Sequence, residues 1–233
     1  TSTLVDTTSG FSVSTYTGTG SATTFGHGLG AAPKLIIVKE RTNDVGSWFV
    51  YHASNTAAPE TDYLLLDTDA VTVDDSTVWN DTAPTSTVFS VGTHDDVNGS
   101  TDTYVAYCFE EIEGFSAMGA YTGNGAADGP MIFTGFQPAY LLIKKASGTA
   151  NNWNLIDNKR IPFNDGDAPY LYADTTAAET NPGDSSQDID LLSTGFKIRN
   201  GNNGYNKSGD SYVYAGFASN PFGGESTTPV TAF

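Results

Sequence analysis

The amino-acid sequence predicts an all-β protein made of two tandem, pseudo-repeated antiparallel β-sandwich lobes of jelly-roll-like architecture. Three observations support this prediction. Motifs recur about 105 residues apart along the 233-residue chain. Short runs of β-branched and aromatic residues are separated by Gly, Asn, Asp, Ser and Thr, as in strands joined by turns. Apolar residues at the 3.6-residue spacing of a helix are almost absent.

The repeat covers most of the chain. Its spacing is far above the roughly 20–50 residues of solenoids and propellers, so each copy is expected to be a whole small domain or half of a fused one. The matching segments are Gly10-Phe11-Ser12 and Gly114-Phe115-Ser116, Tyr16-Thr17-Gly18-Thr19-Gly20 and Tyr121-Thr122-Gly123-Asn124-Gly125, Leu35–Lys39 and Tyr140–Lys144, Trp48 and Trp153, Tyr63-Leu64 and Tyr170-Leu171, Phe89 and Phe196, and Asp102–Val105 and Asp210–Val213.

The repeat also sets the expected domain boundaries. Residues 1–9 form an N-terminal lead-in, 10–113 the first sandwich and 114–220 the second. Residues 221–233 are a C-terminal tail rich in Gly, Ser, Thr and Pro, a composition that seldom folds alone. Because only a few residues separate the copies, we expect no long flexible tether between them.

Strands are predicted at twelve places, six in each copy. In the first copy they are 11–16, 35–40, 48–52, 63–67, 88–92 and 103–111, and in the second 115–121, 139–145, 153–157, 170–173, 196–199 and 211–217. Apolar and polar residues alternate in 11–16 and 103–107, which favours strands with one packed face. The unbroken apolar run 35–38 instead favours a central strand that is covered on both faces.

Composition excludes several classes of partner. The chain has 10 basic and 27 acidic residues and a net charge of −17, which repels nucleic acids and anionic membranes. No segment approaches the ~18 consecutive apolar residues of a membrane helix, so a soluble protein without membrane insertion is expected. The single cysteine, Cys108, lies in an apolar run and is expected to be a small buried residue.

The sequence contains no motif that assigns catalytic residues. The three histidines do not have metal-ligand spacing, and no Gly-x-Ser-x-Gly nucleophile turn is present. No cofactor is therefore expected. Four acidic loops could supply oxygen ligands to Ca²⁺, but solvated turn carboxylates are the usual meaning of such clusters. These loops are Asp67-Thr68-Asp69, Asp74-Asp75, Asp95-Asp96-Val97-Asn98 and Asp165-Gly166-Asp167.

The tryptophans differ in how they recur. Trp48 and Trp153 occupy matching positions in the two copies, which favours a role in the core. Trp79 has no counterpart and precedes Asn80 and Asp81 in a loop-like stretch. Anchoring of the core or the loop by this ring is the favoured interpretation. The alternative is a sugar-binding surface, of which an exposed aromatic ring beside amide and carboxylate groups is typical.

The repeated motifs resemble a domain found in predicted virion and tail-fibre-like proteins of marine tailed phages. The resemblance extends from about Gly10 to Phe222. It rests on the Gly-Phe-Ser and Tyr-Thr-Gly-x-Gly elements, on His27-Gly28-Leu29-Gly30-x-x-Pro33-Lys34-Leu35-Ile36-Ile37-Val38-Lys39, on Trp79–Ser86, on Asp102–Phe109 and on Ala127–Pro130. That family has no established catalytic residues to carry over.

The resemblance implies a structural protein on the exterior of a phage virion, most simply a tail-fibre or receptor-binding module that contacts host glycans. Its partners would be other virion proteins and further copies of itself, with a trimer preferred. The alternatives are a capsid-decorating or fibre-attached protein without receptor binding and, less favoured, a polysaccharide depolymerase. For the binding module, the expected ligand-contacting residues are Trp79, Asn80, Asp81, His94, Asp95 and Asn98.

Overall fold

The computed structural model describes residues 1–42, 46–161, 164, 166, 168–180 and 188–221. Strands account for 42% of the structure and helices for 5%, and the strands form antiparallel sheets. The prediction of an all-β sandwich fold is therefore confirmed. The predicted tail lies outside the described residues except for Pro221.

The chain divides into two compact units. The first comprises Thr1–Asp67 and Thr72–Glu111, and the second comprises Thr68–Val71 and Ile112–Phe233. The change from one unit to the next thus falls between Glu111 and Ile112, two residues before the boundary that the repeat places between 113 and 114.

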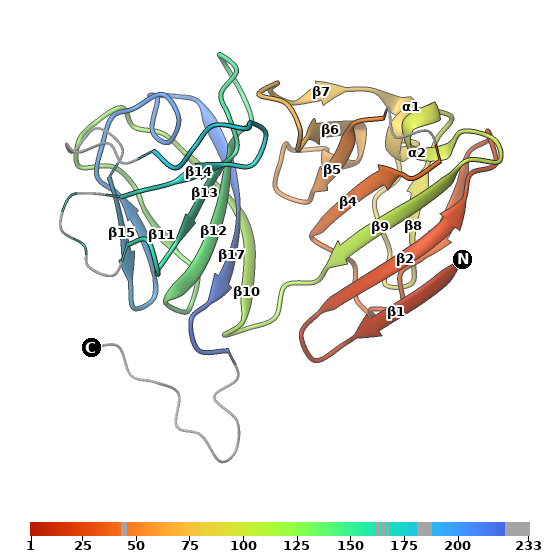
Figure 1. The fold of residues 1–233 in the computed structure, drawn as a ribbon, viewed down its shortest axis with the longest axis horizontal. Helices are drawn as coiled ribbons and strands as arrows, with labels where there is room; N and C mark the ends of the chain where they lie inside the picture. Colours follow the sequence, from red (N-terminus) through yellow and green to blue (C-terminus); the bar gives the residue numbers. More distant parts are fainter. Residues whose placement is uncertain (43–45, 162–163, 165, 167, 181–187, 222–233) are drawn as a thin grey trace. The chain divides into compact units, whose positions relative to one another are not determined.

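The first unit contains two sheets. Its strands are β1 (Ser2–Asp6), β2 (Phe11–Thr17), β3 (Thr23–Gly26), β4 (Leu35–Glu40), β5 (Trp48–His52), β6 (Asp62–Leu65), β7 (Val73–Asp74), β8 (Val88–Val91) and β9 (Thr103–Phe109). Among the described residues, the larger sheet has the order β1-β2-β9-β4-β5-β6-β7, and β3 pairs with β8 (Figure 1). Two one-turn helices, α1 (Ser76–Trp79) and α2 (Asp95–Asn98), and the 3₁₀ turn η1 (Pro59–Thr61) lie in its connections.

The second unit repeats this plan. Its strands are β10 (Ser116–Thr122), β11 (Met131–Phe133), β12 (Pro138–Lys145), β13 (Asn154–Asp157), β14 (Leu171–Tyr172), β15 (Ile189–Leu192), β16 (Gly195–Ile198) and β17 (Ser211–Ala218). Within the described part of the chain, the orders are β10-β17-β12-β13-β14 and β11-β16-β15. The first order matches β2-β9-β4-β5-β6, and β11-β16 matches β3-β8. The strands that recur therefore have the same topology in both copies.

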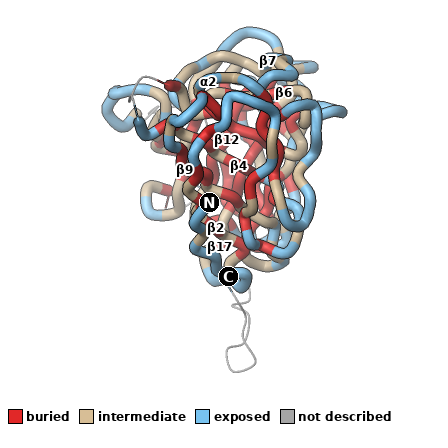
Figure 2. The backbone as a smooth tube through the Cα atoms, turned by 90° about the vertical axis from the view of Figure 1, so that its right-hand side faces the viewer, coloured by how far each residue is buried: buried red, intermediate tan, exposed pale blue. Residues whose placement is uncertain are grey.

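The core of each unit is formed by the inward-facing side chains of its strands. In β2 the burial alternates, with Ser12, Ser14 and Tyr16 buried and the residues between them partly exposed. β4 is central in its sheet, as the apolar run predicts, and Ile36 and Val38 are completely buried. In Figure 2 the buried stretches follow the strands and the exposed stretches are mainly turns. Trp153 is buried, whereas Trp48 is only half-buried and stacks on Tyr107.

A buried asparagine in each unit explains why the Tyr-Thr-Gly-x-Gly motif recurs. In the first unit, Asn98 Oδ1 accepts a hydrogen bond from Thr19 N (2.9 Å), and Asn98 Nδ2 donates to the carbonyls of Ser21 (2.8 Å) and Gly92 (2.6 Å). The side chain thus satisfies three backbone groups of two separate loops. We call this arrangement the asparagine clamp.

The second unit builds the same clamp around Asn206. Its Oδ1 accepts from Asn124 N (2.7 Å), and its Nδ2 donates to the carbonyls of Ala126 (2.8 Å) and Asn200 (2.7 Å). Both asparagines are completely buried. The motif is therefore retained because its backbone is held by a side chain from the loop before the last strand.

Several elements depart from the sequence prediction. Residues 1–9, expected as a lead-in, contain β1, which pairs with β2 from Ser2 opposite Thr15 to Asp6 opposite Phe11. The strands β3, β7, β11 and β15 and the two short helices were not predicted. Each spans five residues or fewer, too short to show a periodicity of its own.

The two units differ in charge at one buried position. Lys145 in β12 is completely buried, and its Nζ lies 2.7 Å from Asp210 Oδ2 and 2.5 Å from Asn203 Oδ1. In the repeat, Lys145 corresponds to Glu40 of the first unit. Its partner Asn203 corresponds to Asp95, and its partner Asp210 corresponds to Asp102. The copies have kept their topology while changing this polar group.

His27 is buried in the loop after β3, where it joins neighbouring backbone segments. Its Nδ1 accepts a hydrogen bond from Leu29 N (3.3 Å), and its Nε2 lies 3.1 Å from the carbonyl oxygen of Thr85. Since Nδ1 accepts, the neutral ring carries its proton on Nε2. Burial lowers the pKa of His27 below the ordinary 6.5, opposed by the hydrogen bond to Thr85.

We therefore expect His27 to make folding sensitive to mild acid. Because its pKa is lower in the folded state, the unfolded chain binds more protons near pH 6, and stability falls as the pH drops through about 6.5 towards the folded pKa. Thermal unfolding at pH 7.5 and pH 5.5 should show a smaller decrease in Tm for His27→Gln than for the parent protein. Equal decreases in the two proteins would refute this role of His27.

Candidate functional site

The ligand-contacting residues expected from the sequence lie at one end of the first unit. His94 N donates a hydrogen bond to Thr77 O (3.0 Å), and Gly92 N donates to Val78 O (2.8 Å). These bonds hold α1 beside the segment that leads into α2, and the two helices are neighbours in Figure 1. The structure therefore brings residues 79–81 and 94–98 to the same end.

Trp79 does not lie on the surface, which corrects the expectation for this residue. Its side chain is 2% exposed, belongs to the hydrophobic core and meets the ring of Tyr51 edge to face at 6.1 Å. Asp75 caps the N-terminus of α1 through Thr77 N, and the following turn directs Val78 and Trp79 inward. The structure supports the favoured interpretation, a buried ring that anchors the core and the loop.

Asn98 is also internal, because it forms the clamp and is completely buried. His94 is half-buried: its Nδ1 accepts a hydrogen bond from Asp96 N (3.2 Å), and its ring lies 4.9 Å from that of Phe49. Three of the expected residues remain exposed, namely Asn80, Asp81 and Asp95. The buried members therefore build the scaffold, and only the exposed ones are open to a ligand.

The acidic loops have local structural roles. Asp75 caps α1, and hydrogen bonds from Thr77 lower the pKa of its carboxyl group. Asp67 Oδ1 accepts from Trp48 N (3.2 Å), and Asp174 does the same for Trp153 in the second unit. Asp165 and Asp167 lie outside the described residues. In the described part of the chain, no group of three or more His, Cys, Asp or Glu side chains is placed to hold a metal ion.

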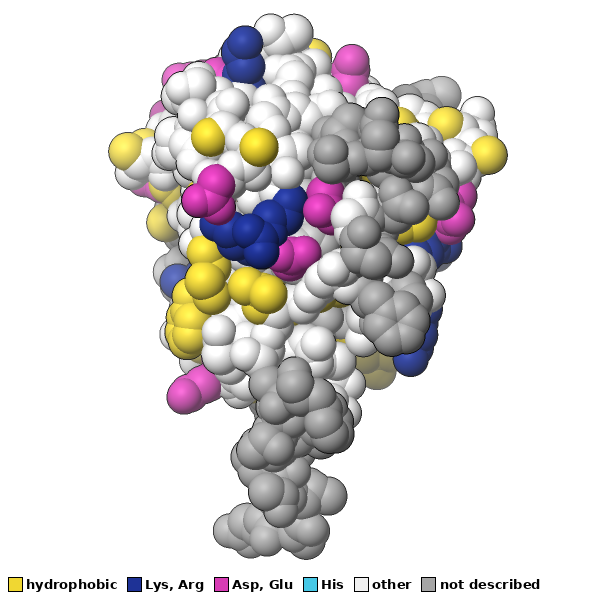
Figure 3. Space-filling view, turned by 90° about the vertical axis from the view of Figure 1, so that its left-hand side faces the viewer, with side chains coloured by type: hydrophobic (Ala, Val, Ile, Leu, Met, Phe, Trp, Pro, Cys, Tyr) yellow, Lys and Arg dark blue, Asp and Glu magenta, His cyan; other side chains and the backbone are white. Residues whose placement is uncertain are grey.

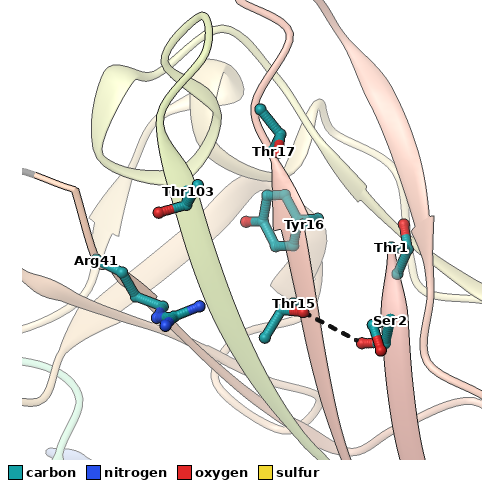
Figure 4. Close-up of a pocket in the computed structure, with 7 residues that line it drawn as sticks. All are labelled: Thr1, Ser2, Thr15, Tyr16, Thr17, Arg41 and Thr103. Atoms are coloured by element: carbon teal, nitrogen blue, oxygen red, sulfur yellow. Dashed lines mark hydrogen bonds between the residues drawn. The ribbon is translucent and has the colours of Figure 1, made fainter.

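A different site is a groove on the outer side of the larger sheet of the first unit. It has a volume of about 330 Å³ and is lined by Thr1, Ser2, Thr15, Tyr16, Thr17, Arg41 and Thr103 (Figure 4). These residues come from four neighbouring strands or their ends, β1, β2, β9 and β4. The lining is thus made of hydroxyl groups, one aromatic residue and one guanidinium.

Strand pairing brings these groups together. Tyr16 pairs with Tyr104 and Thr17 with Thr103 across β2 and β9, while Arg41 directly follows β4 and its backbone N donates to Thr103 O (2.7 Å). Thr103 Oγ1 lies 2.9 Å from Thr42 Oγ1. The ring of Tyr16 is 4% exposed and is stacked between the rings of Phe25 and Tyr104 in the core, so this residue anchors β2 from the opposite face of the sheet. The hydroxyl groups of the groove are fixed by the rigid sheet.

Arg41 differs from the other two arginines in its electrostatic environment. Arg160 forms ion pairs with Asp157 and Glu179, and Arg199 with Asp190. Figure 3 shows basic and acidic side chains side by side on one face of the second unit. By contrast, Arg41 is exposed and forms no ion pair with the described residues. Its guanidinium lines the groove together with the hydroxyl groups.

The arginine of the groove is not repeated in the second unit. In the second unit the residue equivalent to Arg41 is Ala146, whose backbone N makes the matching bond to Ser211 O (2.8 Å). The second unit therefore has the same backbone hydrogen bond but lacks the charged side chain of Arg41. No strand of the described second unit corresponds to β1, which supplies one wall of the groove.

Sequence reasoning missed the groove because its residues are distant in the chain. The alternation in 11–16 predicts a strand with one packed face, but it does not link Thr15 and Thr17 to Arg41 or Thr103. The usable signal was the difference between copies: Arg41 has no charged equivalent, although the residues around it recur.

Comparison with protein families matches residues 1–221 to a family described as a domain of unknown function, DUF7483. The match spans both units, and the chain belongs to this family. No curated protein and no solved structure matches the chain significantly. Among the described residues, no helix is long and apolar enough to cross a membrane.

Proposed function

We propose that this member of the DUF7483 family is a structural protein on the exterior of a tailed-phage virion, where it acts as a tail-fibre or receptor-binding module for host glycans. Three observations support the proposal: the sequence resemblance over nearly the whole chain, the duplicated β-sandwich, and the groove around Arg41. The groove is the observation that carries the binding role. Other virion proteins and further copies of the chain are its expected partners.

The chemistry of the groove suits a carbohydrate. Threonine and serine hydroxyl groups can both donate to and accept from sugar hydroxyls, and they are held by paired strands. The guanidinium of Arg41, which forms no ion pair with the described residues, favours a sugar that carries a carboxylate or sulfate, because such groups accept two parallel hydrogen bonds from arginine. The ligand class is therefore an acidic polysaccharide.

The same lining argues against the depolymerase alternative at this site. Hydrolysis of a glycosidic bond commonly uses two carboxylic acids on either side of that bond. The described residues that line the groove are Thr, Ser, Tyr and Arg, and none of them has a side-chain carboxylate. Binding without cleavage is the expected activity of this surface. A capsid-decorating or fibre-attached protein, the other alternative, is expected to bind no glycan.

Substitution of Arg41 tests the binding role. For Arg41→Gln, we expect affinity for an acidic polysaccharide of the host surface to fall at least tenfold, since a charge-assisted hydrogen bond contributes about 1.5–3 kcal/mol. Lys34→Gln is the matched control, because Lys34 is exposed in the same unit and outside the groove. Isothermal titration calorimetry gives the affinities, and chromatography of the recovered polysaccharide detects cleavage.

Each outcome separates the alternatives. Loss of binding in Arg41→Gln with retention in Lys34→Gln supports the groove. Equal loss in both variants indicates non-specific attraction by charge and refutes it. Shortened polysaccharide supports a depolymerase, and absence of binding by the parent protein supports a decorating protein.

A further inference from the structure

The exposed large apolar side chains are concentrated at sheet edges. Within the described part of the chain, they are Leu4, Val5, Val73, Met131 and Phe133. All five lie on the edge strands β1, β7 and β11. Edge strands present unpaired backbone groups to solvent, and natural proteins usually protect them with charged residues, proline or bulges. Apolar side chains at such positions indicate a contact with another chain.

Among these edges, β1 is the longest and is apolar on both sides. It spans Ser2–Asp6, whereas β7 and β11 span two and three residues. Leu4 is 78% exposed and Val5 is 47% exposed. Because successive residues of a strand point to opposite faces, these two side chains leave apolar surface on both faces of the sheet. One edge of β1 pairs with β2 without a register shift, and the other is the outer edge of the sheet (Figure 1).

We infer that β1 pairs antiparallel with β1 of a second copy of this chain, about a two-fold axis at Leu4. In this register Leu4 faces Leu4 of the partner subunit, and Thr3 faces the partner's Val5. Ser2 faces the partner's Asp6, so a hydroxyl donor meets each carboxylate. The interface is the same patch on both copies, which is the commonest type of contact in homodimers.

Charge favours a second copy at this edge. The chain carries a net charge of −17, so two copies repel each other over most of their surfaces. The segment Ser2–Val5 has no charged side chain, and the only charge in β1 is Asp6. The antiparallel register keeps the two Asp6 carboxylates at opposite ends of the pair. Like charges therefore do not face each other across the new contact.

The pairing has a structural consequence for the groove. A two-fold axis perpendicular to the sheet joins the two larger sheets edge to edge and keeps their outer faces on the same side. Ser2 lines the groove and belongs to β1, so the two grooves lie on one continuous sheet face. Such a dimer can bind one polysaccharide at two points, which raises the effective affinity.

Sedimentation of the full chain tests the association. The parent protein should show a concentration-dependent monomer–dimer equilibrium, and Leu4→Lys should raise the dimer dissociation constant at least tenfold. Val73→Lys is the matched control, because it adds the same charge to the edge strand β7 at the other side of the sheet. A parent protein that is monomeric at all concentrations, a trimer, or an equal effect of the control would overturn the inference.

Cysteine cross-linking tests the register, and it remains informative if Leu4→Lys fails to fold. The native Cys108 will not interfere, since it is buried and burial raises the pKa of its thiol to about 12. Directly opposed residues of paired strands have Cβ atoms about 4.5–5.5 Å apart, near the separation in a disulfide. Oxidised Leu4→Cys should therefore form a covalent dimer, while Val73→Cys should not.

A mixture of Ser2→Cys and Asp6→Cys proteins should form the mixed dimer in preference to either homodimer. Cross-linking without preference among these positions indicates random collision and refutes the register. Neither result depends on glycan binding. The inference can thus fail while the proposed function stands, and the reverse also holds.

Discussion

Replacement of Asn98 by alanine is expected to lower the free energy of unfolding of the first unit by about 4 kcal/mol. The change removes the hydrogen-bonding partner of Thr19 N and of the carbonyls of Ser21 and Gly92. A buried backbone group left without a partner costs roughly 1–3 kcal/mol, and three such groups are affected. Chemical denaturation followed by tryptophan fluorescence measures the change, because Trp48 and Trp79 both lie in this unit.

Two further variants make this prediction specific. Asn206→Ala should destabilise the second unit by a similar amount, since it removes the equivalent bonds. Ser100→Ala, an exposed change in the same loop, should alter stability by less than about 0.5 kcal/mol. If Asn98→Ala were as stable as Ser100→Ala, the clamp would not hold the two loops.

The strands that the sequence predicted are those with a strong local pattern. The segments 11–16 and 35–40 become β2 and β4 almost without change, because their β-branched and aromatic residues favour strands. The packed face of β2 carries Ser12, Ser14 and Tyr16, so hydrophobicity alone does not identify it. β11 has only three residues and was overlooked. It exists because Ile132 pairs with Phe196, a contact between residues far apart in the chain. Such elements depend on tertiary pairing rather than on their own composition.

The errors at the candidate site have the same origin. The polar residues around Trp79 are typical of a loop, but the direction of its ring is set by the core beside Tyr51. The role of Asn98 left a trace in the sequence, since Asn98-Gly99-Ser100 recurs as Asn206-Lys207-Ser208. A polar residue that recurs with the fold is more plausibly structural than ligand-binding. A residue-by-residue comparison of the two copies is what separates a structural asparagine from a ligand-binding one.

The comparison of copies also indicates how function can arise on this fold. The backbone bond of Arg41 to Thr103 is repeated by Ala146 and Ser211, so duplication supplied the same frame twice. In the described part of the chain, the first copy has a guanidinium at this position and the strand β1 that forms one wall of the groove, and the second copy has neither. The structural elements are shared between the units, whereas the candidate binding groups are not, which is consistent with sites that are added to stable scaffolds.

Substitution of Gly18 by alanine is expected to destabilise the first unit by about 3 kcal/mol or more. A Cβ atom at this position would lie 2.1 Å from Gly99 O and 2.8 Å from Asn98 C. Both are backbone atoms, and the clamp on Asn98 prevents them from moving away. The variant must therefore distort the loop that carries Thr19, with loss of hydrogen bonds as well as overpacking. Gly123→Ala should act similarly in the second unit, where Lys207 O would lie 2.3 Å away.

Gly26→Ala provides the control for this substitution. Its added Cβ would have Thr87 O at 3.8 Å as its nearest neighbour, an ordinary contact. The backbone there is already extended in β3, so alanine should leave the midpoint of thermal unfolding within a few degrees of the parent protein. A large decrease in Tm for Gly18→Ala together with a small change for Gly26→Ala would locate the constraint at the clamp. Similar effects of the two variants would instead indicate a general intolerance of added volume.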